Sequence, residues 1–299
     1  MSAVPQRWAA ALLCALWMGA ATAATGVPAC RAPASTATGP TYLLASQADM
    51  IALLPPPPAA DSAAARADLQ AVLDAQRSAS VLERAHAVAD SHASCARFDD
   101  VVGPALAAGS NAALLGFLDR AAREGASLID PVKDYWKRSR PYVDSPLVVA
   151  LGDVAPGQAG SDEDSATASA PGTVACAGVA AAKPPSALAL ARQQAERTKK
   201  ALKRAHASFP SGHAAFGTVC AILLADMLPE RRAALFARAA DFEHSRLVLG
   251  AHFPSDLQAG QLAGTVAAAL LMQNARFQHD FEQARARLRA ALAQPAQTH

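Results

Sequence analysis

Apolar residues recur at helical spacing through the last third of the chain and are separated by polar positions and helix breakers. Gly250 and Pro254 fall between two such segments, as expected where glycine ends one helix and proline opens the next. The apolar runs within 214–228 and 259–272 are about 15 residues or shorter. Because a bilayer requires about 20, these runs are expected to form the core of a helical bundle. The pattern predicts helices over about 186–204, 213–227, 229–248, 254–273 and 277–293.

The first half of the chain carries the same spacing in shorter segments. Residues 60–93 predict two helices or one interrupted helix, with Asp61 or Ser62 as the N-cap.

Two more helices are predicted between residues 111 and 141. The first runs from Asn111 to about Glu124 and is stopped by Gly125. The second starts near Asp130, with a proline at its first helical position, and is ended by Pro141. On this assignment every residue of 130–140 belongs to one helix.

Composition favours the all-helical interpretation. Alanine dominates the 52% of residues that are hydrophobic and only 5% are aromatic, so helices are favoured over strands. We expect an all-α, single-domain helical bundle over 59–299, with an active site formed at helix ends and connecting loops. An irregular N-terminal arm, 24–58, carries four prolines at 55–58 that hold it extended on the surface. Residues 152–178 lack periodicity and predict a flexible inserted loop.

The N-terminus has the layout of a signal peptide. Arg7 precedes the apolar run WAAALLCALWMGAA, and Ala21 and Ala23 offer small residues at the cleavage positions. We expect 1–23 to be removed on export and the mature chain to begin near Ala24. The alternative is a membrane anchor, but about 14 apolar residues are too few to span a bilayer, so no stable membrane insertion is expected after cleavage.

Removal of the signal peptide would leave four cysteines, enough for one or two disulfides in an exported protein. They are Cys30, Cys95, Cys176 and Cys220. Cys220 lies within the apolar stretch AAFGTVCAILLADML, so we expect it to be a buried thiol, and the pairing of the others stays open.

The net charge gives no sign of a polyanionic partner. The chain has 27 basic and 25 acidic residues, a formal charge of +2, and no basic block, so nucleic-acid binding is not expected.

Three groups of polar residues suggest a site for an anion. In the first, KDYWKRSRP, Lys133 and Arg140 are almost two helical turns apart, so the predicted helix would place both cations on one face, about 10 Å apart along its axis. Two such cations can hold an anion from two sides, although a solvated basic face is the commoner meaning of this spacing.

The second group is SFPSGHAAFG at the start of an apolar helix. Proline fixes the direction of the chain, and Ser211 and Gly212 would then present consecutive backbone N–H groups at the positive end of the helix dipole. His213 beside them could donate a proton to an oxygen leaving the anion. The alternative is an ordinary helix start with a surface histidine.

The third group is HSRLVLGAHFPSD. Arg246 and His252 should flank a turn, with Asp256 about one helical turn beyond His252. A carboxylate there can accept the Nδ1 proton of the histidine and leave Nε2 unprotonated as a nucleophile. A buried histidine satisfied by an aspartate is the alternative. Taken together, the three groups supply what phosphoryl transfer without a metal requires.

In their order and spacing these groups resemble the signature of the type 2 phosphatidic acid phosphatase and vanadium haloperoxidase superfamily. Within it, the export signal and the Leu53–Pro58 arm look like the bacterial class A nonspecific acid phosphatases, over roughly residues 41–290. One departure is the long spacer 142–209, which leaves the substrate range less secure than the reaction type. The matched positions are Lys133, Arg140, Pro141, Pro210, Ser211, Gly212, His213, Ser245, Arg246, His252 and Asp256.

The resemblance implies a periplasmic acid phosphatase for small phosphate monoesters that needs no metal or other cofactor and is inhibited by vanadate. His252 would be the nucleophile that forms a phosphohistidine, His213 the general acid and Asp256 the residue that orients His252. The phosphate would be held by Lys133, Arg140, Ser211, Gly212 and Arg246.

Three alternatives use the same residues: a vanadate-dependent haloperoxidase, a lipid phosphate phosphatase, and a phosphate-binding protein without catalysis. The sequence identifies neither the physiological substrate nor any phosphotransferase activity. It is also compatible with a homo-oligomer.

Overall fold

The computed structural model describes residues 42–107, 110–155 and 187–293, all within the compact unit Pro40–His299. Three expected segments lie wholly or partly outside the described residues. They are the signal peptide, the N-terminal arm up to residue 41, and the 152–178 loop from residue 156 onwards.

Every regular element in the described residues is helical, as the all-α prediction requires. The α-helices are α1 (Met50–Leu53), α2 (Ala63–Ser78), α3 (Val81–Asp90), α4 (Asp99–Val102), α5 (Ala112–Ser127), α6 (Asp130–Trp136), α7 (Pro141–Asp144), α8 (Ala187–Ala205), α9 (Gly212–Met227), α10 (Arg232–Val248), α11 (Pro254–Gln273) and α12 (Ala275–Ala293). Four 3₁₀ turns accompany them: η1 (Ala45–Gln47), η2 (Cys95–Phe98), η3 (Gly152–Val154) and η4 (Pro229–Arg231). The five helices predicted for the last third are confirmed to within two residues, except that 229–248 divides into η4 and α10.

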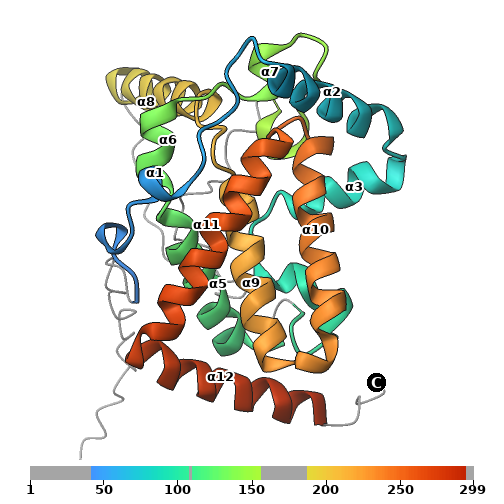
Figure 1. The fold of residues 1–299 in the computed structure, drawn as a ribbon, viewed down its shortest axis with the longest axis vertical. Coiled ribbons are helices and arrows are strands. Elements are labelled where there is room, and N and C mark those ends of the chain that lie inside the picture. Colours follow the sequence, from blue (N-terminus) through green and yellow to red (C-terminus); the bar gives the residue numbers. More distant parts are fainter. Residues whose placement is uncertain (1–41, 108–109, 156–186, 294–299) are drawn as a thin grey trace, which may run out of the picture. The chain divides into compact units, whose positions relative to one another are not determined.

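Helix α9 lies at the centre of the bundle and packs against α5, α10 and α11 (Figure 1). Its side chains are apolar almost all round, and nearly all of its residues are buried, which is the pattern of a helix surrounded by others. Helix α12 follows α11 after one residue and contacts α5, α9 and α11 at the end where α11 finishes. The starts of α9 and α11 therefore lie away from α12 (Figure 1).

Two glycines of α11 allow it to approach α9 closely. A Cβ added at Gly260 would lie 2.4 Å from the Ser211 carbonyl oxygen, and one at Gly264 would lie 2.6 Å from the Ala215 carbonyl oxygen. Real Cβ atoms do not tolerate such distances, so the two backbones can be this close only because both positions lack a side chain. This contact fixes the start of α9 against the first turns of α11.

The N-terminal arm is not wholly on the surface. Residues 45–47 and 50–53 form short helical turns, and four side chains of the arm are buried in the core. These are Tyr42, Leu43, Met50 and Leu54. Their burial anchors the segment before the prolines to the bundle.

Two predicted helix boundaries around residue 130 are wrong. Helix α5 continues through Gly125 to Ser127, because this glycine serves close packing: a Cβ there would lie 3.0 Å from a Val219 methyl group. Helix α6 ends at Trp136, where Lys137 adopts a left-handed conformation with φ 48°. Pro141 begins α7 and does not end α6, in keeping with the preference of proline for the first helical turn.

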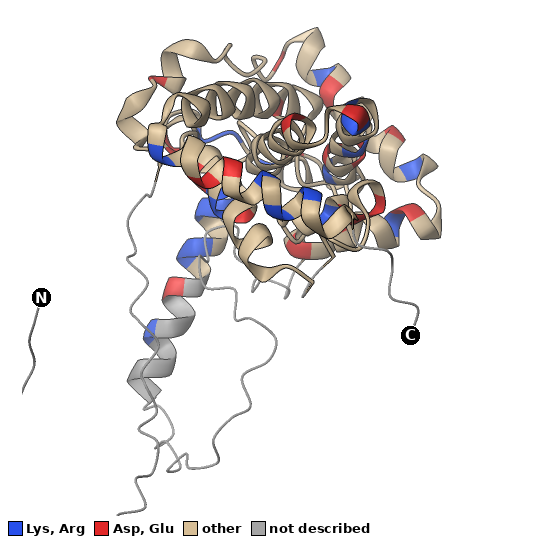
Figure 2. Cartoon of the chain, turned by 90° about the horizontal axis from the view of Figure 1, so that it is seen from below, with Lys and Arg blue, Asp and Glu red and all other residues tan. Residues whose placement is uncertain are grey.

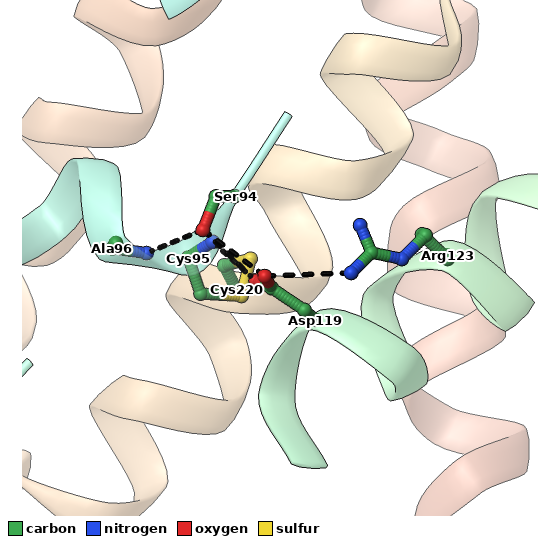
Figure 3. Close-up of a disulfide and its surroundings, with 6 residues drawn as sticks. All are labelled: Ser94, Cys95, Ala96, Asp119, Arg123 and Cys220. Carbon is green, nitrogen blue, oxygen red and sulfur yellow. Dashed lines mark hydrogen bonds and ion pairs between the residues drawn. A yellow bond between two sulfur atoms is a disulfide. The ribbon is translucent and has the colours of Figure 1, made fainter. Parts of the chain in front are cut away.

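The expectation of a free Cys220 thiol is also wrong. Cys220 of α9 forms a disulfide with Cys95 of η2, 125 residues away in sequence, and both sulfurs are buried (Figure 3). The apolar neighbourhood of Cys220 did not exclude this, because a disulfide is as compatible with a dry core as a thiol is. The bond ties the 94–98 segment to the central helix, a constraint worth about 5 kcal/mol of folding free energy in chain-entropy terms.

Charged residues of both signs are interspersed along the helices in the view of Figure 2. Among the described residues, no helix combines the length and the apolar composition needed to cross a membrane.

The close contact between α9 and α11 gives a first prediction. Gly260→Ala should lower the free energy of unfolding by about 1 to 3 kcal/mol, since the new methyl group forces the two helices apart. Gly116→Ala is the matched control: this exposed glycine of α5 has nothing within 4 Å of an added Cβ, so alanine should stabilise the protein by up to about 1 kcal/mol. Urea unfolding measures both, and equal effects of the two substitutions would contradict the proposed close contact.

Glu243 of α10 is a buried carboxyl that faces α9 and α11. It is 4% exposed and accepts hydrogen bonds from Gln261 and, at 3.4 Å, from Thr218 Oγ1. Burial raises the pKa of Glu243 from 4.5 to about 7, because neither of these neutral partners compensates for the lost hydration of the carboxylate.

Glu243 should therefore make the fold less stable as the pH rises. Below pH 4.5 the group is protonated in both states and costs nothing; between 4.5 and about 7 only the unfolded state ionises readily, and the fold loses stability. Glu243→Gln should match the parent protein at pH 4 and exceed its free energy of unfolding at pH 8 by on the order of 3 kcal/mol. The control Glu282→Gln replaces an exposed glutamate. Unfolding curves at both pH values test this; a constant difference between Glu243→Gln and the parent would refute it.

Candidate active site

The residues singled out from the sequence lie at or next to the ends of five helices. Arg246 lies in the last turn of α10, His252 in the loop that follows, and Asp256 in the first turn of α11. The start of α9 brings Ser211, Gly212 and His213 to the same place, and α6 and the start of α7 contribute Lys133 and Arg140.

His252 is held by both ring nitrogens and is fully buried. Its Nδ1 lies 2.8 Å from the backbone carbonyl oxygen of Ser208, which can only accept, so Nδ1 carries the proton. Its Nε2 lies 3.3 Å from Nη1 of Arg140, which can only donate, so Nε2 presents a lone pair. The imidazole is therefore fixed in the tautomer that a nucleophile requires.

The surroundings of His252 keep it neutral. Burial has the largest effect and lowers the pKa of His252, and the positive charges of Arg140 and Arg246 lower it further. Asp256 has the opposite effect, and the resulting pKa is about 3. The lone pair on Nε2 therefore persists far into the acidic range.

Asp256 does not orient His252 in the way the sequence suggested. The Nδ1 proton goes to the Ser208 carbonyl, whereas the nearer Asp256 oxygen, Oδ2, is 3.6 Å from Nδ1. Oδ2 instead accepts hydrogen bonds from Ser208 Oγ at 2.6 Å and from the Phe253 backbone N–H at 2.8 Å. Asp256 thus fixes both the segment that supplies the acceptor and the residue next to His252, and it places a negative charge behind the ring.

The Asp256 carboxyl is ionised despite full burial. Burial alone would raise its pKa, but the contacts with His252, Arg138 and Ser208 outweigh that effect and hold the pKa below its usual value.

Lys133 and Arg140 are brought together, although not on one helix face as predicted. Because α6 ends at Trp136, Lys133 belongs to α6 while Arg140 is the N-cap residue of α7. The Nζ of Lys133 lies 3.3 Å from the point where a Gly212 Cβ would be, at the N-terminal end of α9. Arg140 is 1% exposed and is held by the carbonyl oxygens of Arg204 and Ala251, at 2.9 and 3.2 Å.

The backbone of the PSGH segment supplies one fewer amide than expected. The Ser211 N–H already donates to the Asp256 carbonyl oxygen at 3.0 Å, and the Ser211 side chain caps α9 by accepting from the Ala214 N–H. Gly212 is the first residue of α9, a position whose N–H has no acceptor within the helix. Of the two amides predicted to bind an anion, the Ser211 N–H therefore links α9 to α11, and the prediction now rests on Gly212.

His213 is buried and oriented rather than exposed at a rim. Its ring stacks on Phe242 with 5.6 Å between centroids, and its Nε2 lies 3.0 Å from the Ser91 carbonyl oxygen. Because that oxygen requires an N–H, Nε2 keeps its proton and Nδ1 is the nitrogen that gains or releases one.

Asp153 is a site residue that the sequence pattern did not reveal. Its two carboxylate oxygens each accept from Arg246, at 3.0 Å, and Oδ2 also lies 3.3 Å from Arg204. It belongs to η3, the start of the segment predicted as a flexible surface loop, yet it is 5% exposed. A lone acidic residue beside a Gly/Ser-rich stretch has no periodicity or spacing by which to recognise it.

Comparison with known proteins bears on this arrangement. A family model described as the PAP2 superfamily matches residues 121–280, a range that contains every residue of the site named above except Ser91. The chain belongs to the PAP2 superfamily.

Curated relatives match part of the chain. The chain is 40% identical over 85 residues to the "Non-specific acid phosphatase" of Salmonella typhimurium, 28% of this chain and 34% of that protein. It is 40% identical over 84 residues to the "Acid phosphatase" of Zymomonas mobilis, covering 28% and 32%, and 33% identical over 78 residues to the "Non-specific acid phosphatase" of Providencia stuartii, covering 26% and 32%. The similarity thus spans about a third of the length of these relatives.

Proposed function

We propose that this PAP2 protein is an exported acid phosphatase that hydrolyses small phosphate monoesters without a metal, through a phosphohistidine on His252. The observation that carries the proposal is a buried imidazole with its lone pair on Nε2 and the positive charges of Arg140 and Arg246 beside it. The names of the relatives support the reaction class.

In the first step Nε2 of His252 attacks phosphorus, an N–P bond forms and the P–O bond to the alcohol breaks. Lys133, Arg140 and Arg246 balance the charge on the phosphoryl oxygens, together with the first turn of α9. His213 gives the proton on Nδ1 to the departing oxygen.

In the second step water replaces the alcohol. The same Nδ1 of His213, now unprotonated, removes a proton from the water as its oxygen attacks phosphorus. The N–P bond breaks, its electron pair returns to Nε2, and inorganic phosphate is released. The negative charge of Asp256 stabilises the positive charge that the His252 ring carries between the two steps.

The low pKa of His252 allows the proposed reaction to run at acidic pH. An ordinary imidazole would be mostly protonated, and so not nucleophilic, at pH 5. A pKa of about 3 keeps Nε2 of His252 unprotonated and available there.

Turnover should therefore follow a two-limbed pH profile. With p-nitrophenyl phosphate, kcat/KM should hold down to about pH 4, fall as the pH approaches the His252 pKa of about 3, and fall again at high pH because the mechanism needs a protonated general acid. Activity should survive a chelator and be inhibited by vanadate, which mimics phosphate.

The control is His252→Ala, which should lose at least about 10³-fold in kcat because the nucleophile is gone. A variant with near-normal turnover would exclude the phosphohistidine, and loss of activity with chelator would exclude metal independence. Tight phosphate binding with no hydrolysis at any pH would point to a phosphate-binding protein, and bromide oxidation by the vanadate-loaded protein to a haloperoxidase.

Export to the periplasm is supported by the N-terminal pattern and by the Cys95–Cys220 disulfide, which persists in oxidising compartments. We expect the protein to be recovered from the periplasmic fraction of a bacterial host with an N-terminus near Ala24. N-terminal sequencing tests this, and an uncleaved protein retained in the cytoplasm would contradict it.

A further inference from the structure

Arg138 stands between Lys133 and Arg140 in sequence, but its guanidinium contacts Asp256, whereas that of Arg140 contacts Nε2 of His252. Nη1 of Arg138 lies 2.7 Å from Asp256 Oδ1 and 2.7 Å from Ser255 Oγ, and its side chain is 12% exposed. Arg138 is not one of the cations proposed to hold the phosphate. Its contact with Asp256 therefore needs an explanation of its own.

Arg138 in turn pairs with a carboxylate from a distant part of the chain. Its Nη2 lies 2.9 Å from Oδ2 of Asp68, which belongs to α2 and has a side chain 9% exposed. Asp68 also accepts from the hydroxyl of Ser255 and, at 3.2 Å, from its backbone N–H in the first turn of α11. The charges therefore alternate outwards from the histidine: Asp256, Arg138, Asp68.

Arg138 also contacts the segments on either side of His252. Its guanidinium carbon lies 4.2 Å from the centre of the Phe253 ring, and its carbonyl oxygen accepts the Ser208 N–H at 3.0 Å. Ser208 is the residue whose own carbonyl holds Nδ1 of His252. One arginine thus touches the acceptor segment, the neighbour of the nucleophile and the carboxylate behind it.

We propose that Arg138 and Asp68 are positioning residues for the nucleophile: Arg138 keeps Asp256 ionised and in place, and Asp68 keeps Arg138 there. This inference rests on the proposed function, because it assigns the pair to the phosphohistidine step. Because neither residue is among those proposed to hold the phosphate, the pair acts on the rate of the chemical step and not on binding of the substrate.

The physical reason is the cost of a buried carboxylate. Asp256 is fully buried, and a carboxylate so placed stays charged only while nearby donors and cations offset its lost hydration. The charged groups that face the His252–Asp256 pair are Arg138, with Asp68 behind it, Arg140 and Arg246. Of these cations, Arg138 is the one that pairs with the Asp256 carboxylate. Without Arg138, Asp256 would take up a proton at higher pH and could no longer balance the positive ring of the intermediate.

The test compares Arg138→Met, Arg138→Lys and Asp68→Asn with the parent enzyme, by kcat and KM for p-nitrophenyl phosphate across pH 3 to 9. Arg231→Met is the control, because this arginine holds the carbonyl oxygens of Val101 and Val102, outside the site. Near-ultraviolet circular dichroism verifies that each variant is folded.

For Arg138→Met we expect kcat about 30-fold lower with KM within about twofold, a smaller loss than the ~10⁴-fold seen when an orienting aspartate itself is neutralised. The acidic limb of its kcat profile should move up by about one pH unit. Arg138→Lys should recover part of the rate. Asp68→Asn should lose about 3- to 10-fold, and adding it to Arg138→Met should cost little more, since the two act through one carboxylate.

The inference is overturned if folded Arg138→Met keeps the parent's kcat and pH profile, if its loss lies in KM, or if Arg231→Met loses as much. Should Arg138→Met fail to fold, Arg138→Lys and Asp68→Asn decide: a lower kcat with a shifted acidic limb supports the inference, and parental profiles refute it. An inactive parent protein would refute the proposed function and this inference with it, whereas an active parent with unaffected variants refutes this inference alone.

Discussion

The site depends on how closely α11 approaches α9. Gly260 and Gly264 leave room for the α9 backbone at Ser211 and Ala215, so the first turns of the two helices stand side by side. The Ser211 N–H can then donate to the Asp256 carbonyl oxygen, which joins the anion-binding end of α9 to the helix that follows the nucleophile. If the helices were spaced by ordinary side chains, the two motifs would still exist in sequence but could not act on one phosphorus atom.

Given that contact, electrostatics determine the chemistry. Arg140 and Arg246 are fully buried beside His252, and their charges prevent the imidazole from taking up a proton that would abolish its nucleophilicity. Such a concentration of buried positive charge needs compensation before a substrate arrives. Asp153 supplies part of it by pairing with Arg246 and Arg204, so in the proposed reaction a phosphate ester shares these arginines with a carboxylate that the protein already provides.

Much of this could be predicted from the sequence, because helical periodicity and motif spacing are local properties. The helices of the last third, the start of α9 and the turn before His252 all follow from residues a few positions apart. What could not be predicted depends on contacts across the fold. Cys95 becomes the partner of Cys220 only when η2 packs on α9, and the Nδ1 proton of His252 goes to Ser208 because that segment comes closer to the ring than Asp256 does. The left-handed residue Lys137, which separates Lys133 and Arg140 into different helices, carries no sequence signal at all.

The same distinction explains why the motif residues form only the inner part of the site. A motif records groups that touch the phosphate or the nucleophile, and these have fixed spacings because each must reach the same few atoms. The groups that hold them in place, Asp153 and Ser208 among them, need only the right position in space and can come from any segment that the fold brings near. For a buried nucleophile this outer layer matters as much as the motif, because in a dry site each charge is stabilised only by the protein groups that surround it.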